Sequence, residues 1–240
     1  MRLALLTGGS RGLGLALCET LASNGFKVIE FSRTAPHPYS VRTDLSSPEE
    51  ARRAVAAAIA PIDADRLKEL VVVNNAATLD PIGPANRKSA DSIVANLNTN
   101  FTSAILVLSE IVARFQATAC RKVLANISAG AAHKGVFGWS LYCAAKVGAE
   151  NFIRSLALEQ QIEPFPFITV NIDPGVVDTD MHVQASTASL SDFPARDRFV
   201  QRKAHGQLAS PAVVAAAILR ILELSALSSG ERYDVRDVGA

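Results

Sequence analysis

Cysteines, charged runs and long apolar segments are all scarce in this chain of 240 residues. The three cysteines, Cys18, Cys120 and Cys143, match no metal-binding or redox motif, so we expect no metal site and a reducing, cytoplasmic location. The formal net charge is +1 and no basic run stands out, which argues against a nucleic-acid partner. Without a charged leader or a sufficiently long apolar stretch, we expect neither a signal peptide nor a membrane partner.

Apolar content is high, since 49% of the residues are hydrophobic and only 20% are charged. Such a composition favours a folded domain with a sizeable core. Short apolar runs alternate with helical patterns, which predicts an α/β fold, a single-domain Rossmann-type doubly wound parallel sheet over 1–240. The predicted strands are 3–6, 27–31, 69–73, 122–127, 167–172 and 232–235, and the predicted helices are 13–24, 48–59, 89–117, 140–161 and 211–227.

Segment 178–208 has no clear periodicity and is too long for an ordinary connection. We expect it to form a lid over a substrate site. The alternative is a surface excursion with a helix or two of its own.

A glycine-rich turn follows the first predicted strand and opens the first helix, with the sequence Thr-Gly-Gly-Ser-Arg-Gly-Leu-Gly at 7–14. Glycines let the backbone approach a ligand closely, and a helix N-terminus offers free N–H groups to a pyrophosphate. In this strand–turn–helix context, the turn predicts a dinucleotide site. The turn residues assigned to it are Gly8, Ser10, Arg11, Gly12 and Gly14.

The end of the second predicted strand indicates which dinucleotide binds. An acid at this place is typical of NAD sites, whereas a basic residue suits the 2′-phosphate of NADP. Ser32 and Arg33 supply a hydroxyl and a guanidinium, and Arg11 adds a second cation. Glu30 lies too early to be the ribose acid. We therefore predict NADPH, while a solvated loop charge is the alternative interpretation of Arg33.

Tyr142 and Lys146 lie four residues apart, which places a phenol and an ammonium on one face of a predicted helix. A free tyrosine has a pKa of about 10. A nearby cation is expected to lower that pKa. The pair could then move a proton at a carbonyl or carbinol oxygen. By itself this spacing also fits an ordinary solvated helix face.

Taken in order, these motifs resemble the short-chain dehydrogenases/reductases of the single-domain Rossmann type, over nearly the whole chain. Further matches are Asp44-Leu45, the run Asn-Asn-Ala-Ala at 74–77, Asn100, and the run Pro-Gly-Val-Val-Asp-Thr-Asp-Met at 174–181. Segments 137–146, 156–159 and 174–181 resemble most the branch that contains sepiapterin reductase and benzil reductase.

The resemblance implies a role for each matched position. Lys146 would bind the nicotinamide ribose and tune Tyr142, and Asn100 would carry a water in a proton relay toward Lys146. Self-association into a homodimer or homotetramer through the two long helices is also implied. Further cofactor contacts are implied for Leu13, Asp44, Leu45, Asn75, Ala76, Pro174, Gly175, Val177 and Thr179.

Two positions depart from the family pattern. Ala77 replaces a glycine. The family also places a substrate-binding serine thirteen residues before the tyrosine, where this chain has Ala129, and Ser128 lies one residue earlier. Neighbours on a strand point to opposite faces, so two interpretations of Ser128 stay open. Either the strand end is shifted and Ser128 binds the substrate, or Ser128 only packs or caps.

We therefore expect an NADPH-dependent carbonyl reductase that passes hydride to a ketone or α-diketone, with Tyr142 as proton donor. Phe137 and Trp139 suit an aryl substrate or, alternatively, core packing. The pterin-reducing branch implies Asp234 as a substrate anchor, and a surface position on the edge strand is the alternative. Two other functions stay open: an alcohol dehydrogenase working oxidatively, and an NADP-binding sensor or interaction protein without turnover, to which Ala129 gives weight.

Overall fold

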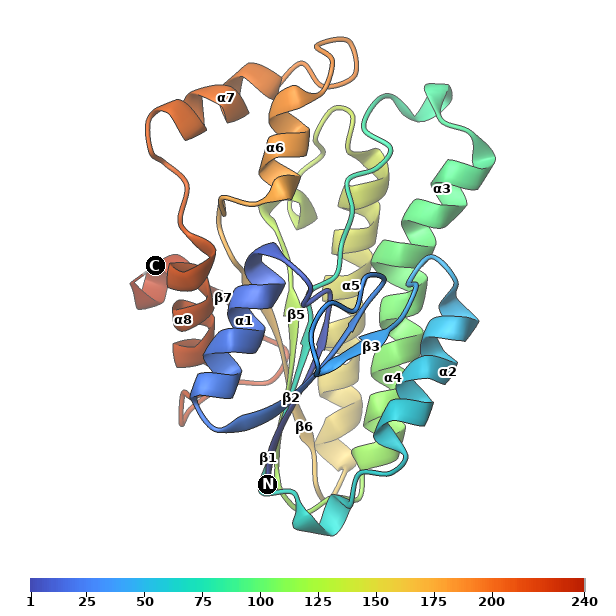
Figure 1. Ribbon diagram of the computed structural model, residues 1–240, viewed down its shortest axis with the longest axis vertical. Helices are drawn as coiled ribbons and strands as arrows, with labels where there is room; N and C mark the ends of the chain where they lie inside the picture. The colour runs from blue at the N-terminus through green and yellow to red at the C-terminus, as the bar shows by residue number, and fades with distance from the viewer. Residues whose placement is uncertain (240) are drawn as a thin grey trace.

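A seven-stranded parallel sheet forms the centre of the computed structural model, which describes residues 1–239 (Figure 1). The strand order β3-β2-β1-β4-β5-β6-β7 confirms the predicted doubly wound Rossmann-type topology. The strands are β1 (Arg2–Thr7), β2 (Phe26–Ser32), β3 (Ser40–Arg42), β4 (Glu69–Asn74), β5 (Arg121–Ile127), β6 (Phe167–Asp173) and β7 (Arg232–Asp234). The short edge strand β3 is absent from the predicted strands, because its three residues carry too little apolar pattern.

Helices cover both faces of the sheet. On one face lie α1 (Gly12–Ser23) and α8 (Pro211–Leu222), and on the other lie α2 (Pro48–Ile59), α4 (Ser103–Phe115) and α5 (Ser140–Glu159) (Figure 1). Three helices extend beyond the carboxyl ends of the strands: α3 (Ala90–Leu97), α6 (Asp180–Thr187) and α7 (Arg196–Ala204). Segment 178–208 therefore has two helices of its own, and α8 ends before the predicted boundary.

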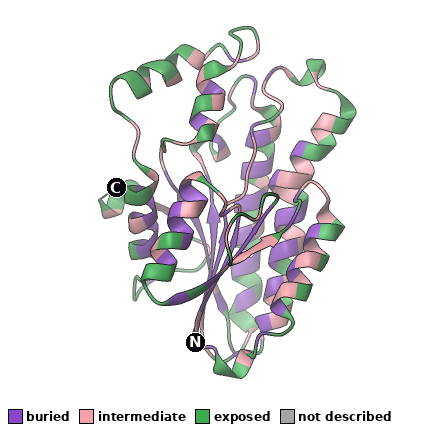
Figure 2. Ribbon diagram, in the orientation of Figure 1, coloured by how far each residue is buried: buried purple, intermediate pink, exposed green. Residues whose placement is uncertain are grey.

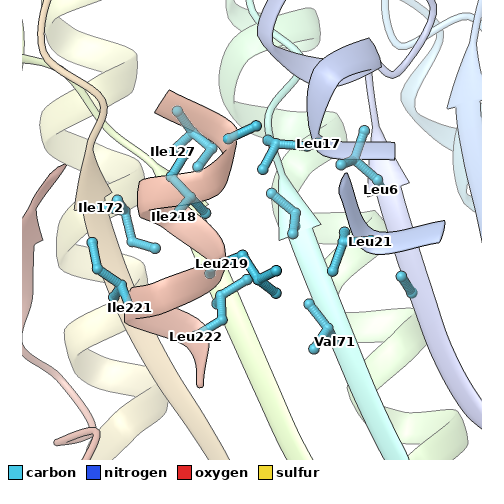
Figure 3. Packing of buried hydrophobic residues seen from close by; sticks show 14 of the residues in the cluster. Leu6, Leu17, Leu21, Val71, Ile127, Ile172, Ile218, Leu219, Ile221 and Leu222 are labelled. Atoms are coloured by element: carbon cyan, nitrogen blue, oxygen red, sulfur yellow. The ribbon is translucent and has the colours of Figure 1, made fainter. Parts of the chain in front are cut away.

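The continuous apolar runs of the sequence become strands buried on both faces, as the purple core of Figure 2 shows. In Figure 3, Leu17 and Leu21 of α1 lie opposite Ile218 and Leu222 of α8, above strand residues such as Val71. Burying one such side chain stabilises the fold by about 1.5–3 kcal/mol. These two helices therefore hold the face of the sheet that carries the glycine turn.

The predicted helix 89–117 is interrupted. A π-helical turn at Asn98–Thr102 separates α3 from α4, and Asn100 is buried within it. The Asn100 side chain accepts from Thr78 N–H at 2.7 Å and donates to Thr78 O at 2.9 Å. Because this partner belongs to the distant loop after β4, the apolar periodicity of the helix could not reveal the turn. Such turns are frequent at functional sites.

A row of buried polar side chains crosses the sheet near its carboxyl edge. Its members are register neighbours on β1, β4, β5 and β6, namely Thr7, Asn74, Asn126 and Asn171. The three donor–acceptor distances along the row are 3.2, 2.9 and 2.8 Å. At its end, the Asn171 amide donates to the backbone carbonyl of Glu150 on α5. The row therefore ties the glycine turn to helix α5.

We expect Asn126→Leu to lower the free energy of unfolding by about 3 kcal/mol, because the buried amides of Asn74 and Asn171 each lose a partner. Urea denaturation measures the change. Asn86→Leu, at an exposed position, is the matched control and should change stability little. Equal stabilities for the two variants would show that the polar row does not stabilise the sheet.

Candidate active site

A cavity of about 1270 Å³ lies at the carboxyl edge of the sheet, where parallel α/β folds bind their ligands. The glycine turn, the loops after β2, β4, β5 and β6, and helices α6 and α7 line it. All the site residues predicted from the sequence line this cavity except Asn100, Asp234 and Phe137, of which Phe137 is largely exposed. The fold therefore brings together residues that are far apart in the sequence.

The glycine turn has no room for side chains at its closest point. A Cβ at Gly14 would lie 2.0 Å from the Gly8 carbonyl oxygen, and Gly8 and Gly12 have φ values of +75° and +55°. The Asn75 amide donates to the carbonyls of Thr7 and Gly8, which fixes the turn against the loop after β4. No side chain caps the N-terminus of α1, so its N–H groups are free for an anion. This cradle fits the pyrophosphate of a dinucleotide.

Beside the turn, Glu30 is fully buried inside β2 and accepts from Gly9 N–H at 3.1 Å. The Ser32 hydroxyl donates to the same carboxylate at 2.9 Å. Glu30 therefore braces the turn from within the strand, and its position does not suit a ribose ligand. No local sequence pattern indicates this bracing role of Glu30, because Gly9 is distant along the chain.

The cations predicted to bind the 2′-phosphate lie at the cavity edge. Arg33 is exposed and forms no salt bridge within residues 1–239. Arg11 pairs with Asp180 of α6 at 2.9 Å, and both side chains are largely exposed. Exposed pairs of this kind contribute little, so Arg11 can exchange partners readily. Hydrogen bonds from the Ser46 N–H and hydroxyl hold the pKa of the neighbouring Asp44 below its usual value.

Tyr142 and Lys146 lie together on α5, and each side chain is about 5% exposed. The Lys146 Nζ donates to Ile127 O at 2.6 Å and lies 5.6 Å from the Tyr142 ring centroid. Burial lowers the pKa of Lys146 to about 8. Burial, together with the charge of Asp173, raises the pKa of Tyr142. The expected lowering of this pKa by Lys146 is therefore wrong for the protein by itself, because burial of the phenolate and the nearby Asp173 carboxylate both raise it.

Asn100 stands behind the cavity wall. Its side chain holds the loop at Thr78 and donates to Asn96 Oδ1 at 3.0 Å. The side-chain amide is therefore committed to protein partners. Its role in a water relay stays a prediction.

At the Ser128–Ala129 pair, strand β5 has ended at Ile127 and the backbone stays extended. Ala129 is extended, with φ −164° and ψ 162°, and packs in the apolar cluster that contains Tyr142. The Ser128 hydroxyl points the other way and donates to the carboxylate of Glu150. A methyl group thus stands on the Tyr142 side where the family has a hydroxyl. The substrate role of Ser128 stays a prediction, and in this structure its hydroxyl supports Glu150.

The two predicted substrate residues differ in position. Trp139 lines the cavity, meets the Tyr142 ring edge-on at 5.8 Å and stacks on Phe193 at 4.9 Å. Asp234 lies outside the cavity lining, and its carboxylate is bound by the side chain and N–H of Arg236, which lower its pKa. A role for Asp234 as substrate anchor stays a prediction.

An ionic network beneath the cavity was missed by the sequence analysis. Glu150 accepts from Arg232 at 2.9 Å and from Arg154 at 2.7 Å, and Arg232 also donates to Asp173 at 2.8 Å. Burial opposes ionisation of Glu150, but the hydrogen bonds from Ser128 and Arg232 outweigh it and lower the pKa. The spacing of Glu150, four residues after the lysine on the same helix face, was the signal available.

We expect Arg232→Met to lower the free energy of unfolding at neutral pH by about 3 kcal/mol, since Glu150 and Asp173 stay buried without their guanidinium. The lowered pKa of Glu150 contributes stability that is present above the unfolded pKa of about 4.3 and is lost as the pH falls through the folded value. Arg232→Met lacks this contribution, so the difference in the free energy of unfolding between the unmodified protein and the variant should be smaller at acidic pH.

Urea titrations at neutral and acidic pH measure this gap. Arg53→Met, which removes an exposed guanidinium that forms no salt bridge within residues 1–239, is the control and should change stability little. A gap that does not narrow in acid would contradict the role given to Glu150.

The part of the chain that the structure describes contains neither a candidate membrane span nor a metal-binding cluster. Within residues 1–239, no helix is long and apolar enough to cross a membrane. In the same range, no three metal-binding side chains of His, Cys, Asp or Glu form a group.

Comparison with known proteins agrees with this geometry. The chain is 32% identical over 242 residues to a benzil reductase ((S)-benzoin forming) of Bacillus subtilis (strain 168), with 99% of each chain covered. It is 28% identical to a sepiapterin reductase of Xenopus tropicalis, covering 98% of this chain and 96% of that one.

Solved structures support the fold. The aldohexose dehydrogenase of Thermoplasma acidophilum matches with a TM-score of 0.78 at 20% identity, over 100% of this chain and 95% of that one. A short-chain dehydrogenase from Burkholderia cenocepacia J2315 in complex with NADP matches with a TM-score of 0.75 at 24% identity, over 97% of this chain and 95% of that one. The family model described as short chain dehydrogenase matches residues 2–189. The chain therefore belongs to the short-chain dehydrogenase family of oxidoreductases, which use nicotinamide cofactors.

Proposed function

We propose that this protein is an NADPH-dependent carbonyl reductase that acts on a ketone or an α-diketone. The observation that carries the proposal is the buried pair Tyr142 and Lys146 in one cavity with the glycine turn. The similarity to benzil and sepiapterin reductases supports the reductive direction and the substrate class. When bound, the dinucleotide supplies the hydride to the carbonyl carbon.

The chain's own residues divide the remaining tasks. The glycine turn and the N-terminus of α1 would hold the pyrophosphate, and Arg33 with Arg11 would hold the 2′-phosphate. Lys146, fixed by the Ile127 carbonyl, would hold the ribose beside the reacting centre. The Tyr142 hydroxyl is protonated at neutral pH and lines the same cavity, so this side chain would give the proton to the substrate oxygen.

The substrate end of the cavity suits a planar molecule. Trp139 and Phe199 form an aromatic wall of the cavity next to Tyr142, and the buried Phe193 packs behind them, with ring centroids 4.9 to 5.8 Å apart. Flat aromatic surfaces attract aryl groups by stacking. Helix α7 carries Phe199 of this wall, and side chains of both α6 and α7 line the cavity, which supports the lid role proposed for segment 178–208. Exposed apolar residues on α5, including Val147 and Leu158, accord with the predicted homodimer or homotetramer, which stays a prediction.

A cofactor-binding protein without turnover is the second candidate. The observation that favours it is the methyl group of Ala129 on the Tyr142 side, with the Ser128 hydroxyl turned to Glu150. A hydrogen-bond donor at this place can contribute several kcal/mol to the transition state. The intact buried pair on α5 argues for turnover, because a sensor has no need of it.

We expect the protein to oxidise NADPH in the presence of benzil or a related aryl ketone, and Tyr142→Phe to lower kcat by about 10²–10⁴ because no proton donor remains. Loss of NADPH absorbance measures turnover, and NADPH fluorescence measures binding, which the variant should retain. NADPH binding without consumption across a panel of ketones and diketones would instead favour the non-turnover candidate.

We also expect Arg33→Ala to raise the KM for NADPH by about 10–100-fold while leaving the KM for NADH unchanged, since one charge-assisted contact to the 2′-phosphate is lost. Initial rates with each cofactor test this. Arg53→Ala, an exposed cation on α2 outside the cavity lining, is the matched control. An equal loss with both cofactors, or a preference of the unmodified protein for NADH, would contradict the NADPH assignment.

A further inference from the structure

One buried side chain in the cavity lining has no partner for either of its polar atoms. His182 of α6 is 4% exposed, and neither Nδ1 nor Nε2 has a hydrogen-bond partner in the described part of the chain. Burial lowers the pKa of His182, so the ring is neutral at physiological pH and offers one donor and one acceptor. Buried polar groups are normally satisfied, and an exception within a cavity indicates a ligand contact.

The position of His182 relative to the reacting centre follows from ring contacts. Its ring lies 5.4 Å from Phe199, which lies 5.5 Å from Trp139, and Trp139 is the residue that meets Tyr142. Among the described rings, no direct contact joins His182 to Tyr142. The His182 ring is therefore separated from the Tyr142 ring by the rings of Phe199 and Trp139, and both His182 and Tyr142 line the same cavity.

We propose that His182 is a substrate-positioning residue, which binds a second oxygen of the substrate while Tyr142 serves the oxygen being reduced. This inference rests on the proposed reductase function and narrows its substrate class. The preferred substrate is an aryl ketone with a second oxygen nearby, such as an α-diketone or a hydroxy ketone. A neutral imidazole suits both, because it can donate to a carbonyl or exchange donor and acceptor roles with a hydroxyl.

The absence of a hydroxyl at position 129 makes this contact more important. With Ala129 on the Tyr142 side, the reacting oxygen has one protein donor fewer than the family pattern provides. A substrate held at its second oxygen by His182 and on its aryl group by the aromatic wall is still placed against Tyr142. The other unpartnered donor among the described residues of the cavity lining, Trp139 Nε1, can only donate and therefore cannot serve a hydroxyl in both roles.

A matched pair of ketones tests the proposal: benzil, and deoxybenzoin, in which a methylene replaces one of the two carbonyls. In His182→Phe, kcat/KM for benzil should fall about tenfold, mainly through KM, because one hydrogen bond is lost. The value for deoxybenzoin should stay unchanged. His182→Gln, which keeps a donor and an acceptor, should recover part of the loss.

Stability separates this role from a structural one. His182→Phe removes two unpartnered buried nitrogens and adds an apolar ring beside Phe199, so its Tm should equal or exceed that of the unmodified protein. The proposal would be overturned if His182→Phe lowered kcat/KM equally for both ketones. It would also be overturned if His182→Phe had no effect and only Trp139→Phe, which removes the other unpartnered donor, lowered kcat/KM for benzil.

Binding to the NADP⁺-loaded protein, followed by calorimetry, separates failure of this inference from failure of the reductase function. If neither ketone is reduced but His182→Phe removes a preference for benzil over deoxybenzoin, the positioning role stands and the reductase function fails. If the unmodified protein binds both ketones equally, or the preference survives in His182→Phe, the positioning role of His182 is wrong whatever the turnover.

Discussion

The buried polar row from Thr7 to Asn171 sets the register of the whole carboxyl edge of the sheet. Its amides lie between layers of apolar side chains, where water cannot replace a lost partner. A strand displaced by one residue would turn these amides to the opposite face and leave them unsatisfied. Only one alignment of β1, β4, β5 and β6 is therefore compatible with folding, and that alignment places the glycine turn beside helix α5.

Helix α5 carries two kinds of chemistry along one face. Near its N-terminus, burial keeps the Tyr142 hydroxyl protonated and brings the pKa of Lys146 to about 8. One turn further on, Glu150 is an ionised carboxylate, because Ser128 and Arg232 donate to it. Arg232 also binds Asp173 at the end of β6, so the network joins the helix to the edge strand β7. The charges that surround the reacting centre are thus fixed by the fold before any ligand binds.

The substrate side is built differently from the cofactor side. Backbone geometry forms the cradle of the glycine turn, whereas side chains shape the substrate end: Trp139 and Phe199 of the aromatic wall, and His182 of α6. Trp139 and His182 carry unpartnered nitrogens there, so this wall can offer polar contacts besides stacking. A protein that has lost the usual hydroxyl at position 129 can still orient its substrate if binding energy comes from this wall. Specificity would then lie in the segment that covers the cavity rather than in the sheet.

Much of this organisation could be predicted from the residues alone. Apolar runs alternating with helical patterns predicted the parallel sheet, because strands buried on both faces need apolar residues at every position. The glycine spacing at 7–14 and the four-residue interval between Tyr142 and Lys146 are local, so the sequence indicated both. The family followed from the same motifs taken in order.

Tertiary structure alone decided the features that depend on distant partners. The π-helical turn at Asn100 forms because a loop after β4 binds its side chain, and the hydroxyl of Ser128 turns to the Glu150 carboxylate, which Arg232 also binds. Likewise, desolvation and the charge of Asp173 raise the pKa of Tyr142 in the folded protein. Burial and long-range contacts depend on residues that are distant in the sequence, so no local sequence pattern determines them. The sequence by itself determined the motifs and the fold class, and packing decided where each polar group found, or lacked, its partner.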